Sequence, residues 1–228
     1  MNAPEISALL AKNGVCSEKE AKAAFNSGAL NENFEMLRQI TNAGERYYRL
    51  EGYLFPDTYE FFQNEDPDQV VKKLVSNCSR KLTKQIRVKT QEREMSLDQM
   101  LTLASMIQAE AADKEDMYKV SSVFHNRLKS KKSELLHLSS DPTTYYPYRQ
   151  LSLVPENIRS TYKSRYDTYT IKGLPAGPIC NPGMDAIDAA LNPASTRYYY
   201  FCHSKEGKAY YATTAIGHKV NLKKAGLR

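Results

Sequence analysis

Apolar side chains recur at helical spacing in several stretches of the chain. In the clearest one, Ser96 and Gln99 form a capping box, and apolar residues then recur every three or four positions as far as Ala111. This spacing predicts a helix that ends near Ala112. The same spacing, with caps or Pro and Gly at the ends, predicts further helices at residues 6–12, 17–25, 34–40, 67–82, 116–128 and 183–192.

Between and after these helices the pattern is that of loops and short strands. Residues 47–62 are rich in Tyr and Phe and indicate a strand or a loop, and 64–68 resemble a linker. Residues 198–202 and 209–212 flank a Glu-Gly pair and predict a β-hairpin. We therefore expect a mixed α+β fold with a boundary near Asn64, which divides the chain into parts 1–63 and 64–228.

Composition and charge narrow the class of protein. The 228 residues are 41% hydrophobic and 25% charged, which is ordinary for a globular chain, and no apolar run approaches the roughly 20 residues that span a bilayer. The net charge of +6 would suit an anionic polymer. Because the basic residues are spread out and no nucleic-acid-binding motif accompanies them, we expect no nucleic-acid partner.

The four cysteines and four histidines lack the spacings of metal sites. Neither a Cys-x-x-Cys pair nor a His-Glu-x-x-His motif occurs. We expect no metal, and we interpret most of the cysteines as small buried apolar residues.

One carboxylate lies beside an apolar helix face. Glu110 falls near the end of the helix that begins after Ser96, on the flank of its apolar stripe. Such surroundings raise the pKa of a carboxyl group, as a general acid requires, although on spacing alone a Glu at the edge of a helix is far more often a solvated surface residue. Residues 139–143 predict a turn or a helix start, and the Gly- and Pro-rich residues 173–183 either support the fold or shape a cleft.

Several sequence blocks together resemble the YceG-like family of endolytic murein transglycosylases. The blocks are LEGYLFPDTY at 50–59, LASMIQAEA at 103–111, VFHNRL at 123–128, SDPT at 140–143, YDTY at 166–169, the loop 173–183 and ALNP at 190–193. The family's helix motif carries two Glu residues, of which the first is Gln108 here and the second aligns with Glu110. Asp167 stands where the family usually has Asn, and Ala176 where it usually has Pro.

The resemblance implies an architecture and a location. It implies a truncated LysM-like N-terminal subdomain, represented by the helices of residues 6–25, and a catalytic domain with a lysozyme-like helical active-site core and short strands. It also implies attachment to the extracytoplasmic face of the bacterial membrane through an N-terminal helix absent from this chain. Peptidoglycan glycan strands are the expected partner, together with cell-wall synthesis proteins.

The resemblance further implies a reaction without metal or cofactor. Glu110 would act as acid and then as base to cut the MurNAc–GlcNAc β-1,4 bond and leave a 1,6-anhydro end. The residues expected to bind the substrate are Asn126, Arg127, Ser140, Asp141, Thr143, Tyr166, Asp167 and Tyr169. Two alternatives remain: a muramidase-like hydrolase that uses Asp167 or Asp141 as a second carboxylate, and a peptidoglycan-binding module without activity.

Overall fold

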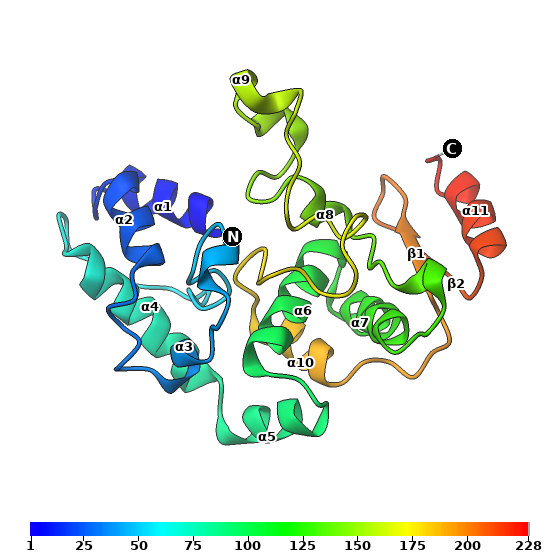
Figure 1. The fold of residues 1–228 in the computed structure, drawn as a ribbon, viewed down its shortest axis with the longest axis horizontal. Coiled ribbons are helices and arrows are strands. Elements are labelled where there is room, and N and C mark those ends of the chain that lie inside the picture. The colour runs from blue at the N-terminus through cyan, green and yellow to red at the C-terminus, as the bar shows by residue number, and fades with distance from the viewer. Residues whose placement is uncertain (228) are drawn as a thin grey trace.

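The chain folds into helices and one two-stranded antiparallel sheet, and the structure, a computed structural model, describes residues 1–227 (Figure 1). The elements are α1 (Ala3–Lys12), α2 (Glu18–Asn26), α3 (Glu35–Arg38), α4 (Pro67–Lys81), α5 (Lys84–Glu92), α6 (Leu97–Glu110), α7 (Lys114–Leu128), α8 (Asp141–Thr144), α9 (Glu156–Arg159), α10 (Met184–Leu191), β1 (Tyr200–His203), β2 (Ala209–Ala212) and α11 (Ala215–Lys224), with 3-10 turns at Ala43–Glu45, Ser133–Leu135 and Leu151–Leu153. The mixed α+β prediction is confirmed. Within residues 1–227, no helix has both the length and the apolarity needed to cross a bilayer.

Helix α6 is the central helix of the fold. The Ser96 hydroxyl accepts from the Gln99 N–H at 3.1 Å and the Gln99 side chain accepts from the Ser96 N–H at 2.8 Å, so the capping box predicted from the sequence is present. Along its length α6 packs against α10 and α7, with further contacts to α5 and α8. The helix ends at Glu110, where Ala111 adopts an extended backbone. A rigid, buried helix thus determines where the Glu110 side chain lies.

Most of the predicted helices and the hairpin are confirmed, and three helices were missed. Helices α5, α9 and α11 were not predicted because none has a buried apolar face: α5 buries only Thr90, and α9 and α11 bury none of their residues. Residues 47–62, expected as strand or loop, contain turns and irregular chain. Periodicity therefore found the helices that build the core and missed those that lie on the surface.

The elements are arranged along the long axis of the molecule (Figure 1). Helices α1, α2 and α4 lie at one end, the hairpin and α11 lie at the other, and α6, α7 and α10 lie between them. A single cluster of buried apolar residues includes members from both sides of residue 64, from Ala3 to Leu191. The division into parts 1–63 and 64–228 stays a prediction.

Glu51 links three distant parts of the chain inside this core. Its buried carboxylate accepts hydrogen bonds from the Ala3 N–H at 2.8 Å, the Tyr146 hydroxyl at 2.9 Å and the Asn181 amide at 2.6 Å. Burial raises the pKa of Glu51 to about 7, against the opposing effect of these donors. The start of α1, the Tyr146 loop and the Gly- and Pro-rich loop are thereby joined at one carboxyl group.

The Gly- and Pro-rich loop of residues 173–183 packs directly on the turn at Gly52. Gly52 has φ of +88°, and a Cβ built there would lie 2.3 Å from Cγ of Pro178. The Asn181 side-chain oxygen accepts from the Gly52 and Leu54 N–H groups, each at 2.8 Å. Of the two roles that the sequence left open for this loop, these contacts assign it the structural one.

Candidate active site

Glu110 accepts a hydrogen bond from a residue 30 positions further along the chain. The Ser140 hydroxyl donates to Oε1 of Glu110 at 2.6 Å. Burial raises the pKa of Glu110 to about 7; the Ser140 hydrogen bond and the charge of His203 oppose this rise, while the nearby Asp141 carboxylate adds to it. A carboxyl group with this pKa exists in both protonation states near neutral pH. It can therefore donate a proton and later accept one.

Ser140 is held by a network of buried hydroxyl groups. Its N–H donates to Oγ1 of Thr168 at 2.8 Å, and its carbonyl accepts from Oγ1 of Thr143 at 2.6 Å. Because the Thr143 proton is used in that bond, the 2.9 Å contact between the two threonine hydroxyls is donated by Thr168. Helix α8 starts directly after Ser140, with Pro142 in its first turn. The Ser140 hydroxyl is consequently fixed toward Glu110.

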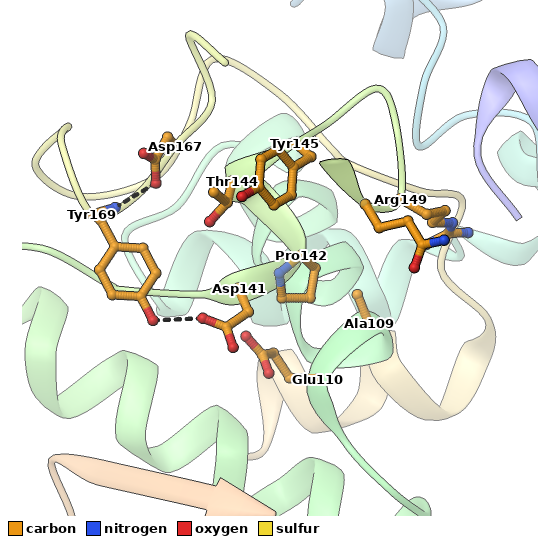
Figure 2. Close-up of a pocket in the computed structure, with 10 residues that line it drawn as sticks. Ala109, Glu110, Asp141, Pro142, Thr144, Tyr145, Arg149, Asp167 and Tyr169 are labelled. Atoms are coloured by element: carbon orange, nitrogen blue, oxygen red, sulfur yellow. Dashed lines mark hydrogen bonds between the residues drawn. The ribbon is translucent and has the colours of Figure 1, made fainter. Parts of the chain in front are cut away.

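A cavity of about 730 Å³ opens on one side of Glu110 (Figure 2). Its lining consists of Ala109, Glu110, Asp141, Pro142, Thr144, Tyr145, Arg149, Gln150, Asp167 and Tyr169. The Tyr169 hydroxyl donates to Asp141 at 2.6 Å, and Asp167 accepts from the Tyr169 N–H at 3.0 Å. Figure 2 shows Asp141 next to Glu110, whereas Asp167 lies at the far end of Tyr169. Asp141 is thus the second carboxylate beside Glu110.

A second cavity, of about 540 Å³, opens on the side of the hairpin. Its lining consists of Glu110, Val123, Arg127, Leu138, Ser139, Asp141, Tyr169, Tyr200, Phe201, Cys202, His203, His218, Leu222 and Leu227. Both cavities include Glu110, Asp141 and Tyr169. The two cavities therefore meet at Glu110, which has space on either side.

Arg127 lines the second cavity but uses its donors on the backbone. Its guanidinium donates to the carbonyls of Tyr199 at 2.6 Å and His137 at 2.8 Å, and it lies 5.0 Å from the ring centroid of Tyr200. Arg127 thus fastens the hairpin to the segment that leads into Ser140. Its predicted contact with substrate stays a prediction.

The remaining predicted residues lie outside both linings. The Asn126 amide donates to the carbonyls of Thr196 and Tyr198, at 3.1 and 2.8 Å. Thr143 is buried in the hydroxyl network, and Tyr166 is buried against Tyr146, with ring centroids 4.7 Å apart. For Tyr166 this contact is the packing role that tyrosines in such a segment commonly have. Substrate binding by these three residues stays a prediction.

Sequence reasoning missed His203, Tyr145 and Arg149, which line the cavities, and Thr168, which holds Ser140. Thr168 could have been found, because it lies inside the YDTY block. His203 is brought to the site by the hairpin and is part of no motif. Among residues 1–227, no three His, Cys, Asp or Glu side chains are grouped so that they could hold a metal ion.

Comparison with known proteins places the chain in a family. The model of the YceG-like family matches residues 1–224. The chain belongs to the YceG-like family. Its structure is similar to the crystal structure of a yceG-like protein from Listeria monocytogenes, with a TM-score of 0.82 at 26% sequence identity, and the match covers 97% of this chain and 73% of that one.

Curated relatives of this YceG-like chain carry a common name. The chain is 36% identical over 177 residues to the endolytic murein transglycosylase of Bacillus subtilis. This match covers 74% of this chain and 46% of the relative. It is 30% identical over 189 residues to the endolytic murein transglycosylase of Streptococcus pneumoniae serotype 2. This match covers 80% of this chain and 33% of the relative. The chain therefore spans less than half the length of these relatives.

Proposed function

We propose that this chain carries the catalytic part of an endolytic murein transglycosylase. The observation that carries the proposal is Glu110, a carboxyl group whose pKa is raised to about 7 and which lies where two cavities meet. The names of the curated relatives support the same activity. The substrate is the glycan strand of peptidoglycan.

In the first step Glu110 is neutral and acts as the acid. Its proton passes to the glycosidic oxygen between MurNAc and GlcNAc, the bond from MurNAc C1 to that oxygen breaks, and the GlcNAc side leaves as an alcohol. The substrate's N-acetyl carbonyl stabilises the positive charge that develops at C1. The Ser140 hydrogen bond stabilises the carboxylate that Glu110 becomes.

In the second step the Glu110 carboxylate acts as the base. It removes the proton from the C6 hydroxyl of the same MurNAc, and O6 forms a bond to C1. The product is a 1,6-anhydro end, no water is consumed, and Glu110 regains its proton. One carboxyl group is sufficient for this cycle, whereas glycoside hydrolases ordinarily use two.

The arrangement of the cavities supports cleavage inside a strand. Because space is available on both sides of Glu110, sugar units can occupy positions before and after the bond that is cut. Carboxylate and hydroxyl oxygens from Asp141, Asp167 and Tyr169 line one side, where they can accept hydrogen bonds from sugar hydroxyls and acetamido N–H groups. The Tyr169 ring, which is about half exposed, also offers an apolar face to a pyranose ring.

A hydrolase is the second candidate, because Asp141 lies next to Glu110 (Figure 2). In that reaction Asp141 would act as the second carboxylate, either as a nucleophile or as a base for water. The hydrogen bond from Tyr169 and the names of the relatives favour the transglycosylase, in which Asp141 raises the pKa of Glu110 without reacting.

We also propose a setting for this activity. The helix pair α1 and α2 is interpreted as part of a LysM-like subdomain, and α6, α7 and α10 as a lysozyme-like core. An activity on murein would fit a location at the extracytoplasmic face of the bacterial membrane, with cell-wall synthesis proteins as partners and a preceding helix as the proposed attachment. Pull-down from membranes of a cell that carries the full-length protein tests this setting.

The activity is tested by mass spectrometry of the ends formed when the chain digests long peptidoglycan strands, with Glu110→Gln as the paired variant. We expect 1,6-anhydro ends, lighter by one water and resistant to borohydride, from the wild type and none from Glu110→Gln, whose amide cannot transfer the proton. Reducing ends would support the hydrolase and direct attention to Asp141. Intact strands from both proteins would contradict catalysis, and equal cleavage by both would remove Glu110 from its role.

A further inference from the structure

A buried carboxylate lies behind the second cavity and is not part of the reaction described above. Asp116 lies in the first turn of α7 with 5% of its surface exposed. Its oxygens accept from the Ala112 N–H at 3.0 Å, from Nε2 of His203 at 2.7 Å and from the Tyr211 hydroxyl. Although burial raises the pKa of Asp116, these hydrogen bonds outweigh it and lower the pKa below its usual value. Asp116 is therefore a stable anion, which the N-terminus of α7 also favours.

The hairpin brings His203 to this anion. In the register of the sheet, His203 is opposite Ala209 and Phe201 is opposite Tyr211, so His203 and Tyr211 share the face that is turned toward α7. The hydrogen bond to Asp116, followed by its charge, raises the pKa of His203 above the usual value. The ion pair with Asp116 therefore favours the imidazolium form of the ring.

The imidazolium and Glu110 line the same cavity. His203 exposes 19% of its side chain there and interacts electrostatically with Glu110, and within residues 1–227 its hydrogen-bond partner is Asp116. The other charged or titratable groups in this lining are Arg127, Asp141, Tyr169, Tyr200, Cys202 and His218. Arg127 keeps its charge but directs its donors to backbone carbonyls, whereas the charge of His203 lowers the pKa of Glu110.

We propose that His203, held by Asp116, is a positioning residue that keeps a positive charge facing Glu110 and stabilises the carboxylate formed when Glu110 gives up its proton. This inference rests on the proposed function, in which the Glu110 carboxylate forms during the first step of the reaction. The charge of His203 acts against Asp141, which disfavours the same carboxylate. Glu110 thus lies between an anion and a cation whose opposing effects set how readily it loses and regains its proton.

The test is the pH dependence of anhydro-end formation by His203→Gln. Gln can still donate a hydrogen bond to Asp116 but carries no charge. Loss of the positive charge raises the pKa of Glu110, so we expect the alkaline limb of the profile to move up by about 1 pH unit and the maximal rate to fall about tenfold. Lys205→Gln is the matched control: it removes a positive charge from the exposed turn of the same hairpin, and its profile should coincide with that of the wild type.

A second readout is independent of activity. With ¹³C-labelled Glu, the Glu110 carboxyl resonance, assigned by its absence in Glu110→Gln, is titrated by NMR without substrate. We expect the midpoint to rise by about the same amount in His203→Gln, and also in Asp116→Asn, which leaves the ring in place but removes the partner that keeps it charged. Asp116→Asn keeps the test possible if His203→Gln does not fold.

The outcomes separate this inference from the proposed function. If the wild type forms no anhydro ends, the proposed function fails, while a Glu110 midpoint that depends on His203 still supports the charge coupling. If the Glu110 midpoint is the same in wild type and variants, the inference is overturned even when the enzyme is active. A lower rate in His203→Gln with an unchanged pH profile and a lower melting temperature would mean that His203 only ties the hairpin to α7, and would also overturn it.

Discussion

The hydroxyl of Ser140 has little freedom because both of its backbone groups are used. The N–H is bound to Thr168 and the carbonyl is bound to Thr143, so the side chain points at Glu110 as part of a fixed loop. This fixed donor lowers the pKa of Glu110 against the effect of burial, as do the charge of His203 and the backbone N–H of Asp141. Ser140 therefore bears directly on the range of pH in which Glu110 keeps its proton.

Replacing Ser140 by Ala removes the donor and should raise the pKa of Glu110 further. The alkaline limb of anhydro-end formation is then expected to move to higher pH, with a rate at the optimum about tenfold lower because the carboxylate formed in the first step loses a hydrogen bond. The rate of anhydro-end formation, measured as a function of pH, gives both the position of the alkaline limb and the rate at the optimum. Ser133→Ala, in an exposed 3-10 turn, is the control, and a shift of the limb to lower pH would contradict the assignment.

Sequence analysis could identify Glu110 and Ser140 but not the groups that act on them from a distance. Both residues lie in compact motifs whose spacing is visible in the chain. The pair of His203 and Asp116 joins residues 87 positions apart, and no periodic pattern of either segment predicts that the hairpin folds back on α7. Contacts of this kind arise from packing, which becomes visible only in three dimensions.

Among the elements, the Gly- and Pro-rich loop has a structural task that depends on close approach. Pro178 lies where a side chain of residue 52 would be, and the positive φ of Gly52 is one that other residues rarely adopt. The loop and the turn can therefore pack together only if residue 52 has no Cβ.

Gly52→Ala should destabilise the protein by about 2 kcal/mol or more, because it adds both backbone strain and overlap with Pro178. Urea unfolding followed by circular dichroism measures this loss. Gly44→Ala is the matched control, since no atom lies within 4 Å of a Cβ at that position and its φ is ordinary. Equal stability of the two variants would show that the loop can shift to make room.

Helices α5 and α11 show where prediction from periodicity ends. A helix is visible in sequence when one face is apolar, as in α6, and α11 has no buried residue to mark such a face. Helices α5 and α11 instead begin at capping threonines, Thr83 and Thr214, and form without a buried apolar face. The hairpin was predictable because its turn carries a Glu-Gly pair, and its bounds agree closely with the expectation.

At the scale of the whole molecule, Glu51 connects the first helix to loops more than 90 positions away. Its pKa of about 7 lies above its ordinary value of 4.5, so the folded state binds this proton more tightly than the unfolded chain does. The contribution of Glu51 to stability is therefore greatest below pH 4.5 and is lost as the pH rises through about 7.

The wild type should lose up to about 3 kcal/mol of unfolding free energy relative to Glu51→Gln when the pH is raised from 4.5 to 8. The variant has no carboxyl group to ionise at this position, so its own pH dependence should be flatter by that amount. Urea unfolding at several pH values provides the comparison, with exposed Glu45→Gln as the control that keeps the wild-type dependence. Parallel curves for wild type and Glu51→Gln would show that Glu51 ionises in the folded state as it does in water.

The two sides of the first cavity come from different kinds of chain. Ala109 and Glu110 belong to α6, whereas the other lining residues lie between positions 141 and 169, a stretch with only short helices. Glu110 is therefore carried by a packed helix, whereas most of the residues that surround it in this cavity are carried by loops. An engineer could exchange the residues around Tyr145 to Gln150 to alter which polysaccharide is accepted. The exchange would have to retain Ser140 and the two threonines that hold it, as well as Tyr146 and the loop of residues 173–183, which hold the core together.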